Sequence, residues 1–180
     1  MSINLKEDYF SNYDDGKKYE DCFMQFSDFY KCLAAMKRNG LHDVFVLGCA
    51  TGHILKSFIE EGVDAHGIEL SDWAVNNCLP EMKDRILHID MVEWFKMNPE
   101  HKAKTCFSNS ICYLTMSELD FVLTRMSESF EYAWLSFPSI EDEVEDKYRV
   151  INQSREWWSD KIGQYFEKYD HYLYKCKNYK

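Results

Sequence analysis

Residues 48–52, which read Gly-Cys-Ala-Thr-Gly, and the acid Glu69 have the types and spacing of a binding site for an anionic ligand that carries a ribose. Gly48, Ala50 and Gly52 are small, so a ligand can approach the backbone where a larger side chain would block it. A helix that begins near Gly52 presents free backbone N–H groups and the positive end of its dipole, which attract a negative charge. Glu69 follows the first glycine by about 20 residues, where a carboxylate can accept hydrogen bonds from both ribose hydroxyls.

The elements that must position these residues form one strand–helix–strand unit. Residues 44–47 are an unbroken apolar run, Val-Phe-Val-Leu, which is typical of a buried parallel strand. Residues 54–59 carry four apolar side chains at helical spacing, and Gly62 is suited to end that helix. Residues 63–68 predict the next strand, which ends on Glu69. The predicted site therefore lies at the carboxyl edge of a parallel sheet.

The spacing distinguishes between nucleotide cofactors. A dinucleotide-binding turn reads G-x-G-x-x-G, which residues 48–52 do not match. Val-Leu-Gly-Cys-Ala-Thr-Gly at 46–52, followed by Gly-Ile-Glu-Leu-Ser at 67–71, resembles the first two motifs of the class I S-adenosylmethionine-dependent methyltransferases. Two positions depart from that pattern. The family usually has an acid, which helps to hold the loop, where Val46 stands, and a glycine where Ala50 stands.

The resemblance covers about residues 10–176 and implies the fold and the cofactor. The fold would be three-layer α/β, a doubly wound and mostly parallel sheet with a closing antiparallel strand, a Rossmann-like methyltransferase fold. The cofactor would be S-adenosylmethionine, with S-adenosylhomocysteine as its product. The implied cofactor-binding residues come from the loops that follow four strands, and they are Gly48, Cys49, Ala50, Gly52, Glu69, Leu70, Asp90, Met91, Asn109 and Ser110.

Two of the implied contacts follow later strands. Asp90 ends a third predicted strand over residues 85–90, where the family holds the adenine amino group, with the Met91 backbone N–H beside it. Asp90 would also serve as a helix N-cap, and the two roles are compatible. Asn109 and Ser110 follow a fourth predicted strand over residues 104–108, in the loop that lies under the methyl group in the family.

We expect a single methyltransferase-like domain over residues 1–180. Its parts are an N-terminal lid and helix (1–40), a cofactor-binding core (41–137), and an insertion with a C-terminal helix and strand (138–180). In the family the segment before the first helix often folds over the cofactor, so the lid candidates are Tyr9, Tyr13 and Tyr19.

Shorter sequence patterns predict where the remaining helices and strands begin and end. Helical periodicity covers residues 19–38, and the predicted helix N-caps are Ser71, Ser117 and Ser154. Residues 132–137 predict a fifth strand. The tail from 166 to 176 is short for the two strands that usually end the family's sheet, so either one strand is missing or residues 148–151 supply it.

Composition limits the class of partner and the compartment. The chain has 180 residues, of which 46% are hydrophobic, and a formal charge of −10. A phosphate backbone would be repelled on average, and the sequence Ser-Asn-Ser-Ile after the fourth strand lacks the pattern of enzymes that methylate nucleobase amino groups. Seven cysteines without a C-x-x-C pair predict reduced thiols in a cytoplasmic protein. No apolar run has the length of a membrane span, and no histidine spacing predicts a metal.

The function best supported by these residues is transfer of a methyl group to an O or N atom of a small-molecule acceptor. The family has no universal catalytic residue, so the catalytic residues stay unknown. The base candidates are His88, His171, Tyr113 and the early tyrosines Tyr9, Tyr13 and Tyr19. His88 is expected to be a core histidine instead. One alternative is a non-catalytic S-adenosylmethionine-binding partner subunit, motivated by Val46 and the short tail. Another is a different transferase or a reductase on the same fold. The acceptor and the oligomeric state stay open.

Overall fold

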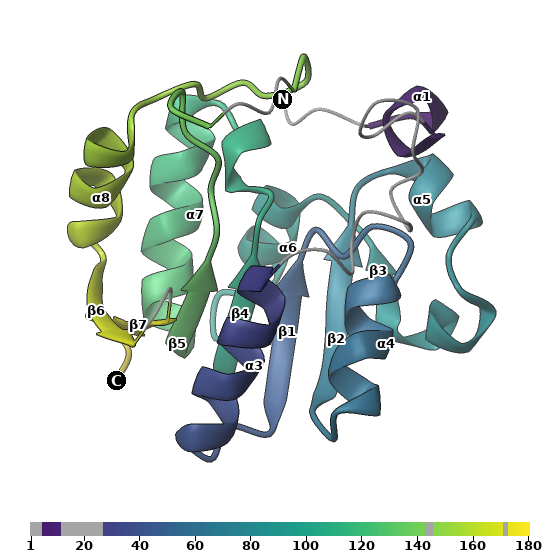
Figure 1. The fold of residues 1–180 in the computed structure, drawn as a ribbon, viewed down its shortest axis with the longest axis horizontal. Helices are drawn as coiled ribbons and strands as arrows, with labels where there is room; N and C mark the ends of the chain where they lie inside the picture. The colour runs from purple at the N-terminus through teal and green to yellow at the C-terminus, as the bar shows by residue number, and fades with distance from the viewer. Residues whose placement is uncertain (1–4, 12–26, 143–145, 171–172) are drawn as a thin grey trace. The chain divides into compact units, whose positions relative to one another are not determined.

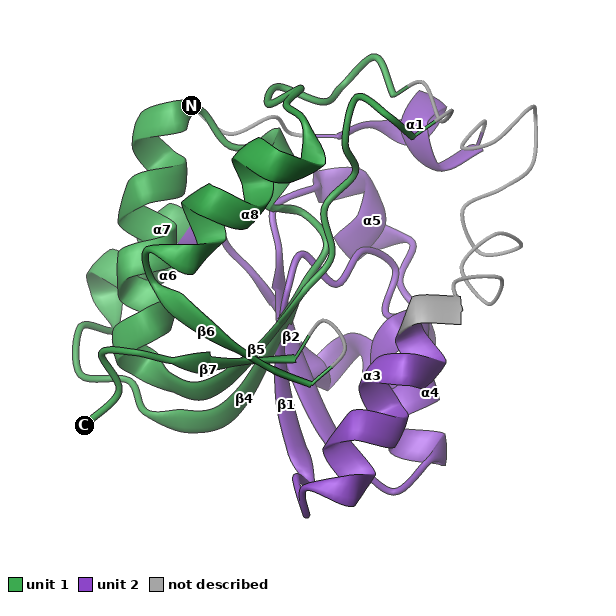
Figure 2. Cartoon of the chain, turned by 60° about the vertical axis from the view of Figure 1, so that its left-hand side comes forward, with its two compact units in different colours: residues 1–3, 92–180 green, residues 4–91 purple. Residues whose placement is uncertain are grey.

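The computed structural model describes residues 5–11, 27–142, 146–170 and 173–180. These residues fall into two compact units, which Figure 2 colours separately: unit 2 comprises residues 4–91, and unit 1 comprises residues 92–180 with residues 1–3. The prediction of a single domain stays a prediction.

In its described residues, unit 2 contains three parallel strands: β1 (Asp43–Leu47), β2 (Asp64–Glu69) and β3 (Ile86–His88). Their order is β3-β2-β1, and β1 and β2 are aligned along their whole length, with Leu47 opposite Ile68. The two strands predicted around the glycine loop are confirmed. The third is shorter than predicted, because Pro80 begins a 3-10 helix, η1 (Pro80–Arg85), that leads directly into it.

The α-helices that the structure describes in unit 2 are α1 (Glu7–Ser11), α3 (Ser27–Arg38), α4 (His53–Glu60) and α5 (Asp72–Asn76) (Figure 1). The rings of Phe29 in α3 and Phe58 in α4 meet edge to face at 4.8 Å, which joins these two helices. The sequence prediction did not include α1. This short helix exists because Phe10 is buried and stacks on Trp73 of α5, with ring centroids 5.0 Å apart.

The strands described in unit 1 are β4 (Ala103–Ser108), β5 (Phe130–Leu135), β6 (Phe166–Asp170) and β7 (Leu173–Cys176). Their order is β4-β5-β7-β6, in which β4 and β5 are parallel and β7 runs antiparallel to β5. The tail therefore forms both of its strands, as an antiparallel pair, and the expectation that one is missing or supplied by residues 148–151 is wrong. With this closing strand, the predicted mostly parallel α/β fold class is confirmed.

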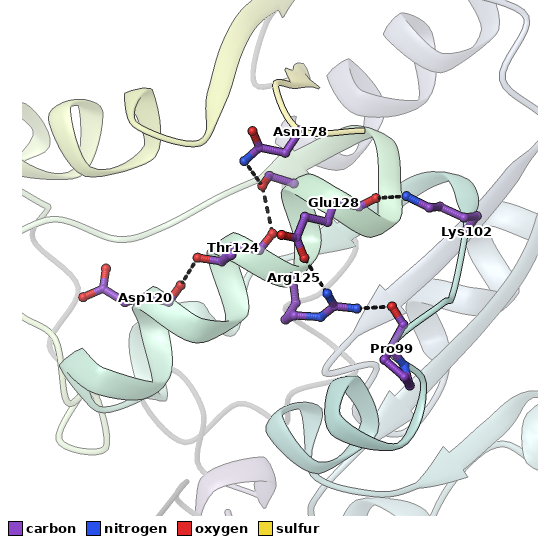
Figure 3. A network of polar contacts seen from close by, with 8 residues as sticks. Pro99, Lys102, Asp120, Thr124, Arg125, Glu128 and Asn178 are labelled. Carbon is purple, nitrogen blue, oxygen red and sulfur yellow. Dashed lines mark hydrogen bonds and ion pairs between the residues drawn. The ribbon is translucent and has the colours of Figure 1, made fainter. Parts of the chain in front are cut away.

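The helices associated with unit 1 are α6 (Met91–Met97), η2 (Ile111–Tyr113), α7 (Met116–Ser129) and α8 (Arg155–Gly163). Polar contacts tie α7 to the chain before β4 (Figure 3). The Arg125 guanidinium donates to the Glu128 carboxylate and to the Pro99 carbonyl, and Lys102 Nζ donates to the Glu128 carbonyl at 2.6 Å. Because these contacts fix the end of α7, they also fix the start of β5, which follows it at once.

No helix among the described residues is long and apolar enough to cross a bilayer.

The caps of the helices are mostly those predicted. Ser71 and Ser154 cap α5 and α8, because their hydroxyls accept hydrogen bonds from Ala74 N and Trp157 N at 3.1 Å. The prediction that Ser117 caps α7 is wrong. Thr115 is the cap, in a capping box with Glu118: the threonine hydroxyl accepts from Glu118 N, and the Glu118 carboxylate accepts from Thr115 N at 2.9 Å. Ser117 is exposed in the first turn.

Replacing the capping threonine tests this assignment. Thr115→Ala should lower the free energy of unfolding by about 1 kcal/mol, because the Glu118 N–H loses the hydroxyl that accepts its hydrogen bond and the Glu118 carboxylate loses the hydroxyl that donates to it. Ser117→Ala is the matched control and should change it by less than about 0.5 kcal/mol, as for other exposed positions. Urea denaturation of both variants measures the difference. An equal or larger loss in Ser117→Ala would contradict the assignment.

Candidate functional site

The loop between β1 and α4 turns sharply through three left-handed residues. Gly48, Ala50 and Gly52 have φ values of 82°, 50° and 86°. The N–H groups of Gly48 and Cys49 both donate to the carbonyl of Ile68 on β2, each at 3.0 Å. Glycine adopts a left-handed backbone conformation easily, whereas other residues do so at a cost in free energy. This explains the two glycines and makes Ala50 a strained position.

Close packing adds a second reason for glycine at two positions. A Cβ atom at Gly52 would lie 2.9 Å from Met82 Cβ, and one at Gly67 would lie 2.8 Å from the Val46 carbonyl and 2.9 Å from Cys49 Cβ. These neighbours are parts of the same unit. Gly52 is thus required by contacts within unit 2, in addition to the ligand approach that the sequence predicted for it.

Glu69, at the end of β2, holds the loop in place. Its Oε2 accepts a hydrogen bond from Ala50 N at 2.8 Å, and its Oε1 accepts one from Ser71 N at 2.7 Å. Burial raises the pKa of this carboxyl, and the backbone N–H groups of Ser71, Ala50 and Leu70 partly offset that rise. The acid therefore joins the glycine loop to the start of α5. In the family's pattern an acid at the position of Val46 helps to hold the loop, but Val46 is here fully buried and apolar.

Asp90 and Met91 follow the carboxyl end of β3, which lies beside the end of β2 that carries Glu69. His88 pairs with Glu69 in the parallel ladder, and Ile89 N donates to the Glu69 carbonyl at 3.0 Å. Asp90 is the next residue, half-buried, and α6 begins at Met91. The chain thus brings these two predicted residues to the strand end that carries Glu69 and Leu70. Their contacts with a cofactor stay a prediction.

His88 is not a core histidine, and this expectation is wrong. Its side chain is 45% exposed, and its Nε2 lies 3.2 Å from the Leu70 carbonyl and 3.4 Å from Asp72 Oδ1. The reason is that β3 is the edge strand of unit 2 and only Ile86 of its residues is buried. The imidazole therefore lies at the surface, beside a carboxylate and next to the carboxyl end of β2.

Ser71 and α1 are features of this site that the sequence reasoning did not assign to it. Besides capping α5, the Ser71 hydroxyl donates to the carbonyl of Leu5, so it ties the chain before α1 to the residue that follows Leu70. Tyr9, a predicted lid residue, is buried in α1 with its ring edge to face with Phe10 at 4.9 Å. Tyr13 and Tyr19 lie outside the described residues, as does the base candidate His171.

The remaining predicted residues belong to unit 1. Asn109 and Ser110 follow the carboxyl end of β4 and are half-buried, and the Ser110 hydroxyl donates to Asn109 Oδ1 at 3.2 Å. Tyr113, a base candidate, donates its hydroxyl hydrogen to Asp146 Oδ2 at 2.7 Å. The loops after β4 and β5 are therefore joined by a tyrosine–aspartate pair. Among the described residues, no cluster of three or more histidine, cysteine, aspartate or glutamate side chains is arranged to hold a metal ion.

Comparisons with known proteins identify the fold. No family model matches the sequence. No curated protein matches it either. Among solved structures, the PH0226 protein of Pyrococcus horikoshii is 16% identical with a TM-score of 0.68, over 96% of this chain and all of that one. Magnesium protoporphyrin IX methyltransferase of Synechocystis with bound S-adenosylmethionine is 13% identical with a TM-score of 0.63, over 97% of each chain.

A third similar structure is an S-adenosylmethionine-dependent methyltransferase of Archaeoglobus fulgidus, 18% identical with a TM-score of 0.58, over 84% of this chain and 76% of that one. At such identities the likeness shows the fold, which is the Rossmann-like fold of class I methyltransferases. It confirms the fold that the two motifs predicted.

Two alanine substitutions separate packing from backbone strain in the loop. Gly52 and Gly62 both have left-handed φ values, 86° and 81°, but a Cβ at Gly62 meets nothing within 4 Å. Gly62→Ala should cost about 1 kcal/mol of unfolding free energy from the left-handed conformation alone. Gly52→Ala should cost about 1–3 kcal/mol more, because the added carbon overlaps Met82. Urea denaturation of both variants measures this, and equal losses would contradict the packing role of Gly52.

Proposed function

We propose that this chain binds S-adenosylmethionine and transfers its methyl group to an O or N atom of a small-molecule acceptor, releasing S-adenosylhomocysteine. The observation that carries the proposal is the pair of hydrogen bonds by which Glu69 holds Ala50 N and Ser71 N. They fix an acid and a glycine loop together at the carboxyl ends of β1 and β2, which is where nucleotides bind in open α/β sheets.

The geometry of Glu69 fits the ribose of this cofactor. A carboxylate has about four acceptor sites. Two are used by Ala50 N and Ser71 N, and the Leu70 N–H also acts on the group. At least one site thus remains for a ribose hydroxyl, in a setting where only 8% of the residue is exposed. The small residues Gly48 and Ala50 would let the rest of the cofactor approach the loop backbone.

The other predicted site residues would make the remaining contacts with the cofactor. Asp90 and Met91 would hold the adenine, and Asn109 and Ser110 would lie on the side of the reactive methyl group. Methyl transfer from a sulfonium is an in-line displacement, so the main task of the protein is to position the acceptor atom against the methyl group. A base is needed only if the acceptor is not already nucleophilic. The catalytic residues are left unassigned.

Charge and thiol chemistry support the proposed acceptor class and compartment. With a formal charge of −10, the chain would repel a nucleic acid backbone on average. Six cysteines in the described residues are free thiols, as expected in a reducing compartment such as the cytoplasm. We therefore favour a small metabolite as the acceptor and a cytoplasmic location.

A second candidate function is a partner subunit that binds the cofactor without catalysis. The observation that favours it is Val46, which stands where the family's loop-holding acid usually is and is fully buried. The bond from Ala50 N to Glu69 supports the first candidate, because it holds the loop without that acid. Calorimetric titration with S-adenosylmethionine, S-adenosylhomocysteine and NAD is the deciding first experiment. Binding of the first two and not of NAD supports the proposal, and binding of NAD alone would favour a reductase.

The ribose contact is tested by Glu69→Gln. The amide cannot accept at both ends, so it loses either a ribose hydroxyl or a backbone N–H, and the affinity for S-adenosylhomocysteine should fall by about 1–3 kcal/mol. Glu81→Gln is the matched control, because Glu81 lies in the same unit but is exposed and pairs with Lys56. Calorimetry measures the affinities, and circular dichroism checks that each variant is folded. Unchanged binding in folded Glu69→Gln would contradict the placement of the ribose.

The raised pKa of Glu69 makes cofactor affinity dependent on pH. Burial places this pKa above the ordinary value of 4.5, so the carboxylate takes up a proton at a higher pH than an exposed glutamate does. Protonation removes acceptor capacity, and the affinity for S-adenosylhomocysteine should therefore fall on acidification while the pH is still above 4.5. Titrations from pH 8 downward measure the effect. Glu69→Gln should lose this component, and a profile that the variant leaves unchanged would contradict the assignment of the titration to Glu69.

A further inference from the structure

Ser71 connects the candidate cofactor site to the chain before α1. Its backbone N–H donates to Glu69 Oε1 at 2.7 Å, and its hydroxyl donates to the carbonyl of Leu5. The same hydroxyl accepts a hydrogen bond from Ala74 N at 3.1 Å, and Ser71 is fully buried. One residue therefore holds Leu5, Glu69 and the first turn of α5, all of which belong to unit 2.

Aromatic packing fastens α1 to the same helix. The ring of Phe10 stacks on that of Trp73 in α5, with centroids 5.0 Å apart and planes inclined by 11°. Both ribbon views show α1 beside α5 (Figure 1 and Figure 2). Trp73 follows Ser71 by two residues. The ring contact and the hydrogen bond to Leu5 therefore act on the same short stretch of chain.

Helix α1 depends on this docking for its stability. It has five residues, and a helix of this length is not stable on its own in water. Its buried residues are Tyr9 and Phe10, so it keeps its place through the burial of two side chains. A segment with so little buried surface opens at a lower free energy than the core of a domain. We expect α1 to undock while the rest of unit 2 stays folded.

We propose that Ser71 is a positioning residue for Glu69, and that it couples the docking of α1 to the binding of S-adenosylmethionine. While α1 is docked, the Leu5 carbonyl fixes the Ser71 hydroxyl, and the Ser71 N–H stays directed at the Glu69 carboxylate. When α1 undocks, the hydroxyl loses its acceptor and Trp73 loses the ring that stacks on it. The first turn of α5 is then less constrained. Glu69 is held less firmly, so fixing it against a ribose hydroxyl costs more conformational entropy on binding.

This coupling must act in both directions. If docked α1 raises the affinity for the cofactor, the bound cofactor stabilises docked α1 by the same factor. The effect on affinity rests on the proposed function, because its ligand is the proposed cofactor. The effect of α1 on the contacts of Glu69 needs no ligand and can be measured in the free protein.

The positioning role is tested by amide hydrogen exchange of the free protein. Phe10→Ala removes the ring that stacks on Trp73. Peptides covering residues 48–52 and 69–75, which carry the donors to Glu69, should exchange about fivefold faster in this variant, at the low end of the range for coupled sites. A peptide covering residues 29–36 of α3 should exchange as in the wild type. Unchanged exchange in the first two peptides, or equal acceleration in all three, would overturn the positioning role.

The coupling is tested by titrating S-adenosylhomocysteine into the wild type, Phe10→Ala, Ser71→Ala and the double variant. Phe10→Ala should weaken binding by at least about fivefold. The double variant should bind like Ser71→Ala, because the hydroxyl that connects α1 to the site is already absent. The matched control is Phe29→Ala, which removes a ring that meets Phe58 at 4.8 Å in the same unit and should bind like the wild type. Circular dichroism checks that each variant is folded.

The outcomes separate the coupling from the proposed function. In the wild type, bound S-adenosylhomocysteine should slow exchange in residues 5–11, a measurement that depends on no variant. Unchanged exchange there, or wild-type affinity in folded Phe10→Ala, would overturn the coupling. Equal losses from Phe10→Ala with and without the Ser71 hydroxyl would overturn Ser71 as the connection. If the wild type does not bind S-adenosylhomocysteine, the proposed function and the coupling to it both fail. Exchange in the free protein still decides whether α1 positions Glu69.

Discussion

The candidate site depends on one buried carboxylate. Glu69 accepts hydrogen bonds from Ala50 N and Ser71 N, and thereby joins the glycine loop, the end of β2 and the start of α5. Ser71 extends the connection, because its hydroxyl also donates to the carbonyl of Leu5, before α1. A buried charge is unfavourable unless it is hydrogen-bonded, so the carboxylate and the N–H groups around it stabilise one another. This single group therefore joins three segments of unit 2, and Ser71 adds the fourth.

This arrangement explains how the loop tolerates its two departures from the family's pattern. Val46 removes an acid from β1, and it is fully buried in an apolar environment. Ala50 adopts a left-handed conformation that costs an alanine about 1–2 kcal/mol. A hydrogen bond to a charged group contributes about 1.5–3 kcal/mol. The bond from Ala50 N to Glu69 is therefore large enough to offset the strain of Ala50 and to hold the loop in place of the missing acid.

Local signals in the sequence predicted the part of the fold that local interactions determine. Apolar runs located β1 and β2, and the glycine at 52 is left-handed as a tight turn requires. The cap of α7 could also have been found, since Thr115 and Glu118 stand at capping-box spacing. Other features depend on distant partners. The short helix α1 requires Trp73 for Phe10 to stack on, and the exposure of His88 follows from the position of β3 at an edge. The residues within each segment therefore indicate neither the helix α1 nor the exposure of His88.

The same physical reasoning explains why this loop is suited to control. A strained residue that one hydrogen bond holds in place is sensitive to small changes in that bond. Protonation of Glu69 would weaken the bond, because a protonated carboxyl has less capacity to accept the hydrogen bond of the Ala50 N–H. In a loop with glycine at position 50 the left-handed conformation would persist without the bond, because glycine adopts it freely. Alanine at this position therefore makes the geometry of the site conditional on the protonation state of Glu69.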